Sequence, residues 1–272
     1  MAPEPAHFTH TDDGGFLPTR FALSHWGDDH LNGPAVVGLA AQVLESQCGS
    51  PDFMPTRLTV DLFRAARSAP TKVDVRVVRD GRRVRSAECD VVQDGRAVAR
   101  ATLIQYRRST APPGVLWEPP APHPSPPPPD DQMMPFIGSD AGWTRSPAAH
   151  QNDSRKSFFN DGIKVIAGES LSPFVRASMV AESTSLVTNL GTEGVGYING
   201  DLTFALSRLP VDDWICIQGD SHRASDGIAV GTATLYDHQG AFGSGMTTAV
   251  ANPAAQIDFA SRSFAPIGLN YE

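Results

Sequence analysis

The sequence predicts an α+β protein built as two tandem repeats, each with a long helix followed by a strongly curved antiparallel sheet. Three observations lead to this fold class. A proline-rich segment divides the 272 residues into two halves of similar size. Each half has an apolar pattern of helical period followed by several runs typical of strands. The halves also align with an offset of about 145 residues, which indicates a duplicated unit.

The dividing segment, residues 111–135, reads APPGVLWEPPAPHPSPPPPDDQMMP. Proline has no backbone donor and its ring blocks the preceding turn, so the segment is neither helix nor central strand. We expect an extended polyproline linker that crosses the surface, with four apolar anchors: Trp117, Met133, Met134 and Phe136. The predicted organisation is a repeat at residues 1–110, a linker at 111–150 and a repeat at 151–272.

In the first repeat, the pattern over Gly33–Gln47 predicts a helix. Asn32 is suited to cap it, and Pro34 fits its first turn. The small residues of this stretch favour close packing in a concave surface. The apolar residues that recur at helical spacing are Val36, Val37, Ala40, Val43 and Leu44.

Four runs rich in Val, Leu and Thr follow the helix and predict an antiparallel meander. The turns Asp80-Gly81 and Asp94-Gly95 are typical of hairpins, because glycine accepts the positive φ that a tight reversal needs. The predicted strands are Arg57–Phe63, Lys72–Val78, Arg83–Val92 and Ala97–Tyr106.

The second repeat has the same order of elements. A helix is expected over Pro173–Asn189, with Ser172 as its cap. In the alignment of the halves, residues 58–60 match 202–204, and Thr102 falls opposite Thr247. The predicted strands are Gly196–Leu206, Trp214–Gln218, Ile228–Tyr236 and Phe242–Ala251.

Composition and charge exclude several classes of protein. A net charge of -8 with a pI near 5.4 argues against nucleic acid as a partner. Three scattered cysteines are too few for a disulfide framework or a zinc site, and we expect no metal and no cofactor. No apolar run is long enough to span a membrane. The N-terminus MAPEPAHFTHTDDGG lacks the features of a secretory signal, so a cytoplasmic protein is expected.

Basic residues cluster at residues 79–85 and at Arg107 and Arg108. Two interpretations remain open for them. They form either a solvated hairpin face or a patch for the phosphates of a charged ligand.

Several stretches resemble the acyl-CoA thioesterase family with a double hotdog fold, of the bacterial type II, medium-chain kind. They are WGDDHLNGPAVVGLAAQVLE, RLTVDLFRAA, VRVVRDGRRVRSAECDVVQDGRAVARAT, YINGDLTFALSRLPVDDWI and the run from Ser225 to Gly240. The resemblance implies two hotdog folds, in which each sheet wraps its own helix and the sheets join edge to edge. It also implies a fatty acyl thioester as substrate, carried by CoA or by a carrier protein.

The resemblance further implies where the catalytic residues lie. The family has an Asp in the second helix, a Thr or neighbouring polar residue on the next strand, and a Gln on the last strand. These positions fall on Glu182, on Asn199, and on Thr247 or, with a shift of one, Thr248. All of them depart from the pattern. Glu is one methylene longer than Asp, and misplacing a base by about 1 Å costs roughly 100-fold in rate.

We therefore take Glu182, Asn199 and Thr247 as the expected catalytic residues. Other interpretations stay open, because Glu182 lies midway along a helix that is expected to be buried, and Asp201 is able to pair with Arg208 instead. The residues expected to bind substrate lie beside the catalytic ones or in the loop before the first helix: Thr248, Asp201, His30, Asn32 and Gly33.

The leading function is hydrolysis of fatty acyl-CoA or related acyl thioesters. The substituted site also favours a catalytically inactive protein that binds acyl-CoA or an acyl chain. A hydratase or dehydratase of acyl thioesters needs a carboxylate and a histidine at a helix start, and His30 beside Asp28 or Asp29 is the nearest arrangement. A structural scaffold without ligand is the remaining alternative. We expect a homo-oligomer, a dimer or higher, because two fused hotdogs are equivalent to one dimer of single ones.

Overall fold

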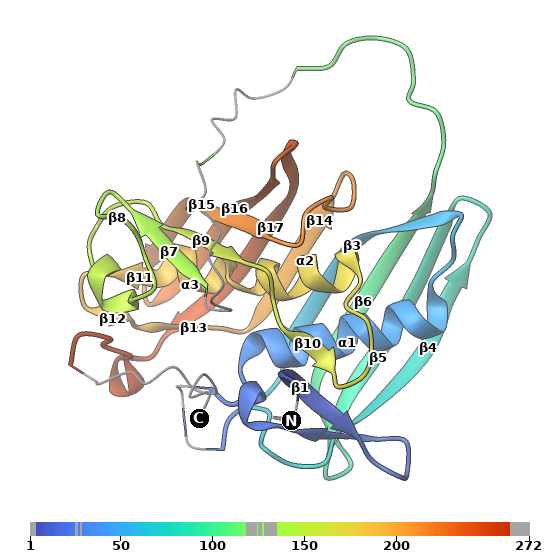
Figure 1. Ribbon diagram of the computed structural model, residues 1–272, viewed down its shortest axis with the longest axis horizontal. Coiled ribbons are helices and arrows are strands. Elements are labelled where there is room, and N and C mark those ends of the chain that lie inside the picture. Colours follow the sequence, from blue (N-terminus) through green and yellow to red (C-terminus); the bar gives the residue numbers. More distant parts are fainter. Residues whose placement is uncertain are drawn as a thin grey trace.

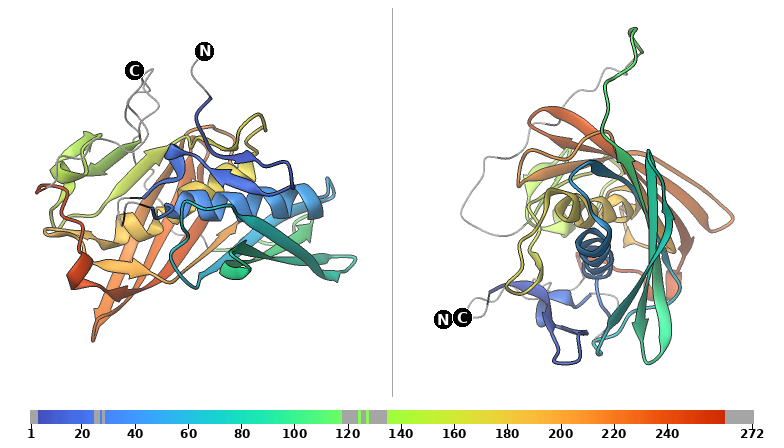
Figure 2. Two further views of the ribbon diagram at one scale, coloured as in Figure 1. Left: turned by 90° about the horizontal axis from the view of Figure 1, so that it is seen from below. Right: turned by 90° about the vertical axis from the view of Figure 1, so that its right-hand side faces the viewer.

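One antiparallel sheet of twelve strands runs through both halves of the chain in the computed structural model (Figure 1). The structure describes residues 4–24, 27, 29–117, 124, 127 and 135–261. Along the sheet the strands follow the order β4-β5-β6-β3-β14-β17-β16-β15-β9-β7-β8, and β13 also pairs with β17. The sheet curves around the helices, which lie inside it (Figure 2).

The elements of the first half begin with a small N-terminal hairpin and continue with one helix and four long strands. They are β1 (Ala6–His10), β2 (Phe16–Pro18), η1 (Arg20–Ala22), α1 (Gly33–Cys48), β3 (Phe53–Leu62), β4 (Lys72–Asp80), β5 (Val84–Gln93) and β6 (Arg96–Arg107). The predicted helix and the four predicted strands of this half are all present, with ends displaced by a few residues.

The second half has short strands before its helices and long strands after them. The earlier elements are β7 (Phe136–Ser139), β8 (Gly142–Thr144), η2 (Pro147–His150), β9 (Ser157–Asn160), β10 (Lys164–Ile166), α2 (Pro173–Glu182) and α3 (Thr184–Asn189). The later ones are β11 (Leu190–Gly191), β12 (Gly194–Val195), β13 (Tyr197–Asn199), β14 (Asp201–Leu206), β15 (Ile215–Ser225), β16 (Ile228–Asp237), β17 (Gly240–Ala251) and η3 (Pro253–Ala255).

The two halves join through β3 and β14, which pair antiparallel with Thr59 opposite Thr203. The two threonine hydroxyls lie 3.0 Å apart in a hydrogen bond. On either side, Leu58 pairs with Phe204 and Val60 with Leu202, and all four side chains are buried. Because exchanging the halves maps one of these pairs onto the other, an approximate two-fold axis passes through the threonine pair.

The register of the sheet corrects one detail of the predicted alignment. Thr59 pairs with Thr102 in the first half, and Thr203 pairs with Met246 in the second. The counterpart of Thr102 is therefore Met246, and the alignment with Thr247 was wrong by one residue. A one-residue shift moves every side chain of a strand to the other face.

Helix α1 begins as predicted. The Asn32 side chain accepts a hydrogen bond from the Ala35 N–H at 2.8 Å, and Pro34 occupies the first turn. Its buried apolar side chains pack against β3 to β6 on one side and α2 on the other. The N-terminal hairpin and β10, which pairs parallel with β1, cover the helices further.

The predicted helix Pro173–Asn189 is not continuous, because it breaks at Ser183 between α2 and α3. At the break the Ser183 N–H bonds to the Val180 carbonyl, three residues back, instead of four. The Thr184 hydroxyl donates to the Ala181 carbonyl at 2.7 Å. Hydroxyl side chains that bond to nearby carbonyls compete with the helical pattern, and this run contains several of them.

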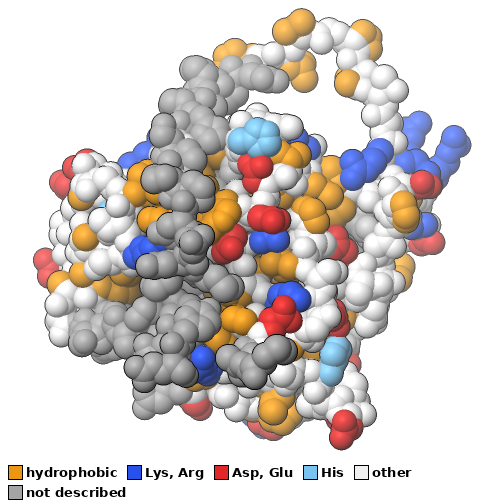
Figure 3. All heavy atoms as spheres, viewed as in Figure 1, with side chains coloured by type: hydrophobic (Ala, Val, Ile, Leu, Met, Phe, Trp, Pro, Cys, Tyr) orange, Lys and Arg blue, Asp and Glu red, His pale blue; other side chains and the backbone are white. Residues whose placement is uncertain are grey.

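Basic and acidic side chains both gather at the edge of the molecule near β4 and β5 (Figure 3), and two of the arginines there are in ion pairs. Arg85 lies 2.7 Å from Asp80, and Arg107 lies 2.9 Å from Asp52. For Arg85 and Arg107, these contacts favour the solvated hairpin face over a phosphate patch. Within the described ranges, no helix has the length and apolar character needed to cross a membrane.

Helix α3 approaches the sheet closely because glycines lie beneath it. A Cβ atom on Gly245 would lie 2.3 Å from the Thr184 hydroxyl oxygen, and one on Gly231 would lie 2.3 Å from that of Thr188. Contacts this short are not tolerated, so α3 keeps its position only while both sheet positions lack a side chain.

Gly245→Ala is expected to lower the free energy of unfolding by about 1–3 kcal/mol, because overpacking forces the helix away from the sheet. Adding Thr184→Ala should restore part of this loss, since it removes the clashing oxygen. Denaturant unfolding of the single and double variants measures the coupling. Gly191→Ala is the control, because a Cβ there meets no atom closer than 4.0 Å. Equal losses in both glycine variants would contradict the close-packing explanation.

Candidate active site

The carboxyl group of Glu182, the last residue of α2, lies against Gly33, the first residue of α1. A Cβ atom on Gly33 would lie 2.0 Å from Glu182 Oε1 and 2.2 Å from its Cδ. Any other residue at position 33 would displace the carboxyl group. The structure thus brings together two residues that the sequence predicted for the site, one from each half of the chain.

Asn199 is the hydrogen-bonding partner of this carboxyl group. Its Nδ2 donates to Glu182 Oε1 at 3.4 Å and lies at the same distance from the Asp201 carbonyl oxygen. Asn199 is on β13, opposite Ala249 of β17. The predicted pair Glu182 and Asn199 is therefore in contact.

Burial raises the pKa of Glu182 to about 8, and the hydrogen bond from Asn199 acts in the opposite direction. The residue as a whole is half-buried. A carboxyl group with a pKa near neutrality is able both to take up and to release a proton at physiological pH.

The start of α1 supplies one free hydrogen-bond donor, the Gly33 N–H. Asn32 caps the helix and is held in place by its own Nδ2, which donates to the Phe21 and Leu23 carbonyls at 3.0 and 3.2 Å. Pro34 has no N–H, and in the described part of the chain no acceptor takes the Gly33 N–H. Helix N-termini with free N–H groups favour negative charge.

The other predicted residues of the second half, Thr247, Thr248 and Asp201, bond to one another. The Thr247 hydroxyl donates to the Asp201 carbonyl at 2.8 Å, and the Thr248 N–H donates to the Asp201 carboxylate at 2.8 Å. The Thr248 hydroxyl bonds to the same carboxylate. Asp201 precedes the core-facing Leu202 and lies opposite the exposed Asp61, so it faces away from the helices.

The alternative partner considered for Asp201 was wrong. Arg208 pairs instead with Asp237, whose Oδ1 lies 2.6 Å from Arg208 Nη2. Asp237 is buried, and this pair fixes the end of β16.

His30 lies in the loop before α1. Its backbone N–H donates to the Gly27 carbonyl at 3.2 Å, and its Nε2 is 3.9 Å from Asp29 Oδ1. Asp29 is also bound by Arg67 at 2.5 Å, which leaves the His30–Asp29 contact long. Asp28, the other carboxylate considered for a hydratase, is outside the described residues.

A second carboxyl group mirrors the first, and sequence reasoning missed it. Glu45, near the end of α1, accepts a hydrogen bond from Ser172, the N-cap of α2. Burial raises the pKa of Glu45. The start of each helix therefore lies beside a carboxyl group that belongs to the other helix. The signal in the sequence was a glutamate near the end of the first predicted helix.

Solved structures of similar fold include a provisionally assigned thioesterase II from Thermobifida fusca, with a TM-score of 0.65 and 17% identity over 90% of this chain and 95% of that one. An acyl-CoA thioesterase II from Mycobacterium marinum has a TM-score of 0.59 and 17% identity, over 80% and 90%. A hot dog fold protein of unknown function from Alicyclobacillus acidocaldarius has a TM-score of 0.65 and 14% identity, over 89% and 94%.

These likenesses show a hotdog fold. Two family models extend the comparison to sequence: the acyl-CoA thioesterase N-terminal domain matches residues 23–105, and the acyl-CoA thioesterase C-terminal domain matches residues 114–250. The chain belongs to the acyl-CoA thioesterase family. A search of curated proteins gives no match. Among the described residues, no group of three or more His, Cys, Asp or Glu side chains is placed to hold a metal ion.

Gly33→Ala should destabilise the protein strongly in the presence of Glu182 and little in its absence, because the added methyl group would occupy the position of the carboxyl group. The expected coupling between Gly33→Ala and Glu182→Ala is about 1–3 kcal/mol in a double-mutant cycle of unfolding free energies. Additive losses would mean that the two residues are not in contact.

Glu182 should also make stability depend on pH. Its pKa is about 8 in the folded protein and ordinarily 4.5, so between these values the folded state holds a proton that the unfolded state releases. Its contribution is complete below pH 4.5 and is lost as the pH rises through about 8. The difference in unfolding free energy between wild type and Glu182→Gln should therefore change in this interval. A constant difference from pH 4 to 9 would count against the raised pKa.

Proposed function

We propose that this protein hydrolyses acyl-CoA thioesters to a free acid and a thiol. The observation that carries the proposal is the enclosed Glu182 carboxyl group against Gly33, the residue whose N–H begins α1. A base and an oxyanion donor are the two groups that attack of water on a thioester needs. Membership in the acyl-CoA thioesterase family supports the same reaction.

In the proposed reaction, the thioester carbonyl oxygen accepts a hydrogen bond from the Gly33 N–H, which stabilises the negative charge that develops on it. The ionised Glu182 takes a proton from a water molecule as the water oxygen attacks the carbonyl carbon. The carbon–sulfur bond then breaks, and the departing thiolate takes the proton back from Glu182. Asn199 holds Glu182 Oε1, so that the carboxylate keeps one orientation.

In this proposal, other residues compensate for two of the departures from the family pattern. Thr247 lacks the amide of the expected Gln, and its hydroxyl is engaged by the Asp201 carbonyl. Asn199 supplies an amide to the carboxyl group from β13 instead. The longer arm of Glu182 is accommodated because Gly33 has no side chain. Thr247, Thr248 and Asp201 would then keep β14 and β17 in position, and Asn32 would keep the start of α1 in position.

We also infer that the chain is a tandem of two hotdog folds, at residues 1–110 and 151–272, joined by residues 111–150. The approximate two-fold axis at Thr59 and Thr203 supports the duplication. The later part of the joining segment is more than a linker, because residues 136–144 form β7 and β8 of the sheet. A homo-oligomer, a dimer or higher, and a cytoplasmic location remain part of the proposal.

Glu182→Gln should lower kcat at least 100-fold, because general-base catalysis contributes on the order of 10²–10⁴. For the wild type, the rate should rise with pH through about 8 as Glu182 ionises. Release of free thiol from a panel of acyl-CoA thioesters of increasing chain length is the measurement. Glu45→Gln is the matched control, since it changes the mirrored carboxyl group at the start of α2. Equal loss in both variants would sink the assignment of Glu182.

Wild-type protein that binds acyl-CoA without releasing thiol would favour the inactive binding protein. Glu182→Asp combined with Thr247→Gln then restores the family pattern and tests whether the scaffold is competent. Protein that neither binds nor hydrolyses any thioester of the panel would leave the scaffold alternative.

A further inference from the structure

Strand β4 forms one edge of the twelve-stranded sheet (Figure 1). In the described part of the chain it pairs only with β5, along Lys72–Asp80. Its other side therefore presents unpaired N–H and C=O groups over most of nine residues. An edge strand of this length is a template for pairing with another strand unless something covers it.

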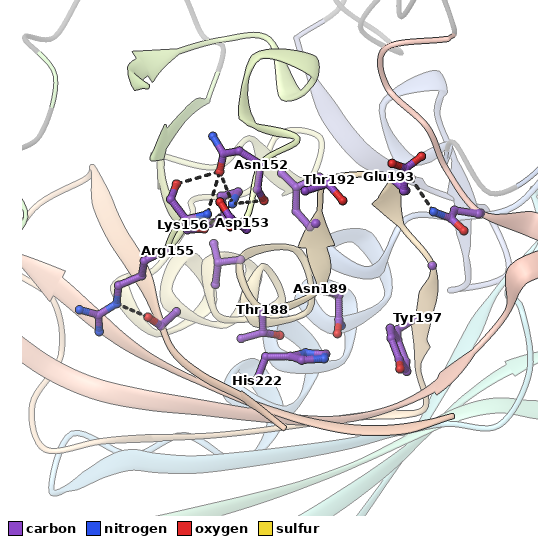
Figure 4. Close-up of a pocket in the computed structure, with 18 of the residues that line it drawn as sticks. Asn152, Asp153, Arg155, Lys156, Thr188, Asn189, Thr192, Glu193, Tyr197 and His222 are labelled. Atoms are coloured by element: carbon purple, nitrogen blue, oxygen red, sulfur yellow. Dashed lines mark hydrogen bonds between the residues drawn. The ribbon is translucent and has the colours of Figure 1, made fainter. Parts of the chain in front are cut away.

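The counterpart of β4 in the second half has its edge covered. Outward from the junction between the halves, the order is β3-β6-β5-β4 on one side and β14-β17-β16-β15 on the other, so β15 corresponds to β4. Strand β9 pairs with β15 along Ile215–Gln218. The loop before β9, which is one wall of a cavity at the end of α3, is held to β15 by Arg155, which lies 2.7 Å from Asp220 (Figure 4). The duplicated unit thus accepts a further strand at this edge, and the described first half has none there.

The residue before β4 shows which backbone groups face outward. Thr71 exchanges two hydrogen bonds of 2.8 Å with Phe16, on the side away from β5, because Gln93 of β5 lies on the other side and bonds to the Thr71 hydroxyl at 2.9 Å. Alternate residues of an antiparallel strand direct their N–H and C=O groups to the same edge. The backbone groups of residues 73, 75 and 77 therefore face outward as well, where the described chain offers them no strand.

On the solvent face of β4, Asp74 lies beside a like charge. Its cross-strand neighbour is Asp90 of β5. Asp90 is bound by Arg76 at 3.2 Å and by Arg100 at 2.7 Å, whereas among the described residues Asp74 is exposed and in no ion pair. Like charges directly opposite each other on a sheet are destabilising. A cation brought to Asp74 from outside the chain would relieve this repulsion.

Two copies of β4 complement each other when they run antiparallel about Val75. In that register Val75 lies opposite Val75 of the second copy, Val73 lies opposite Val77, and Asp74 lies opposite Arg76. The valines form the hydrogen-bonded pairs, because their backbone groups are the ones that face outward. Arg76 uses its Nη1 and Nη2 within its own chain, which leaves Nε for Asp74 of the second copy.

We propose that two copies of this chain associate through β4, paired antiparallel over Val73–Val77 about a two-fold axis at Val75. This inference rests on the homo-oligomer of the proposed function, for which it names the surface, and does not depend on the reaction. The paired segment is bounded by Thr71, which already bonds to Phe16, and by the bulge between Val77 and Arg79. Five residues from each copy make a small interface, so we expect a dissociation constant in about the micromolar range.

Asp74→Arg should raise the dissociation constant at least about 100-fold, because arginines would then face each other twice across the axis. Adding Arg76→Asp should restore association, since the Asp–Arg pairs form again in the opposite sense. Sedimentation equilibrium over a range of concentrations is the measurement. Glu193→Arg, the same change of charge on an exposed side chain of the second half, is the control.

The outcomes separate the interface from the rest of the proposed function. A wild type that is monomeric at every concentration would overturn both the interface and the homo-oligomer. An oligomer that Asp74→Arg leaves intact would overturn the interface alone. Release of thiol by the wild type is measured separately and bears only on the reaction.

A disulfide tests the register without relying on charge. Asp74→Cys protein mixed with Arg76→Cys protein and oxidised glutathione should form a linked heterodimer, since facing residues that are not hydrogen bonded have Cα atoms about 4.5 Å apart, within reach of a disulfide. Nonreducing electrophoresis and mass spectrometry of the linked peptides identify the bond. The wild type, with its three native cysteines, is the control. No link in the mixture, or an equal link in either variant alone, would overturn the proposed register.

Discussion

The contact between the Glu182 carboxyl group and Gly33 is the constraint on which the site depends. The two residues belong to different halves and to the facing ends of neighbouring helices, so the contact exists only while α1 and α2 keep their relative position. That position is fixed by the pairing of β3 with β14 on one side and by helix packing on the other. A sheet that continues across the junction is stiff enough to hold a carboxyl group next to a helix start, which a flexible connection between two domains would not do.

The fold could be predicted from local patterns where those patterns are strong. The cap at Asn32, the alternation in the long strands and the turn at Gly95, where φ is +71°, each have a local physical cause, and the elements formed where expected. Gly81 also lies between two strands, but its φ is not positive, so the reason given for that turn was wrong. The break at Ser183 could not be predicted in the same way. It depends on hydroxyl groups that bond to carbonyls one turn back and on glycines of β16 and β17 that let α3 descend onto the sheet.

The site was predictable in part. Glu182 and Asn199 followed from a resemblance, and their contact agrees with it. The alignment gave no indication that Thr247, Thr248 and Asp201 bond to one another, because the local shift of one residue decides which face of β17 each side chain takes.

Strand β1 pairs parallel with β10, so Ala6 lies opposite Lys164 and Phe8 opposite Ile166. Phe8 is fully buried in the same core as α1. The first residues of the described chain therefore acquire their place only after more than half of the polypeptide has been made. Contacts of such long sequence separation form slowly, because the loop-closure entropy must be lost before they are gained. During synthesis, one side of α1 would therefore stay exposed until β10 has been made and pairs with β1.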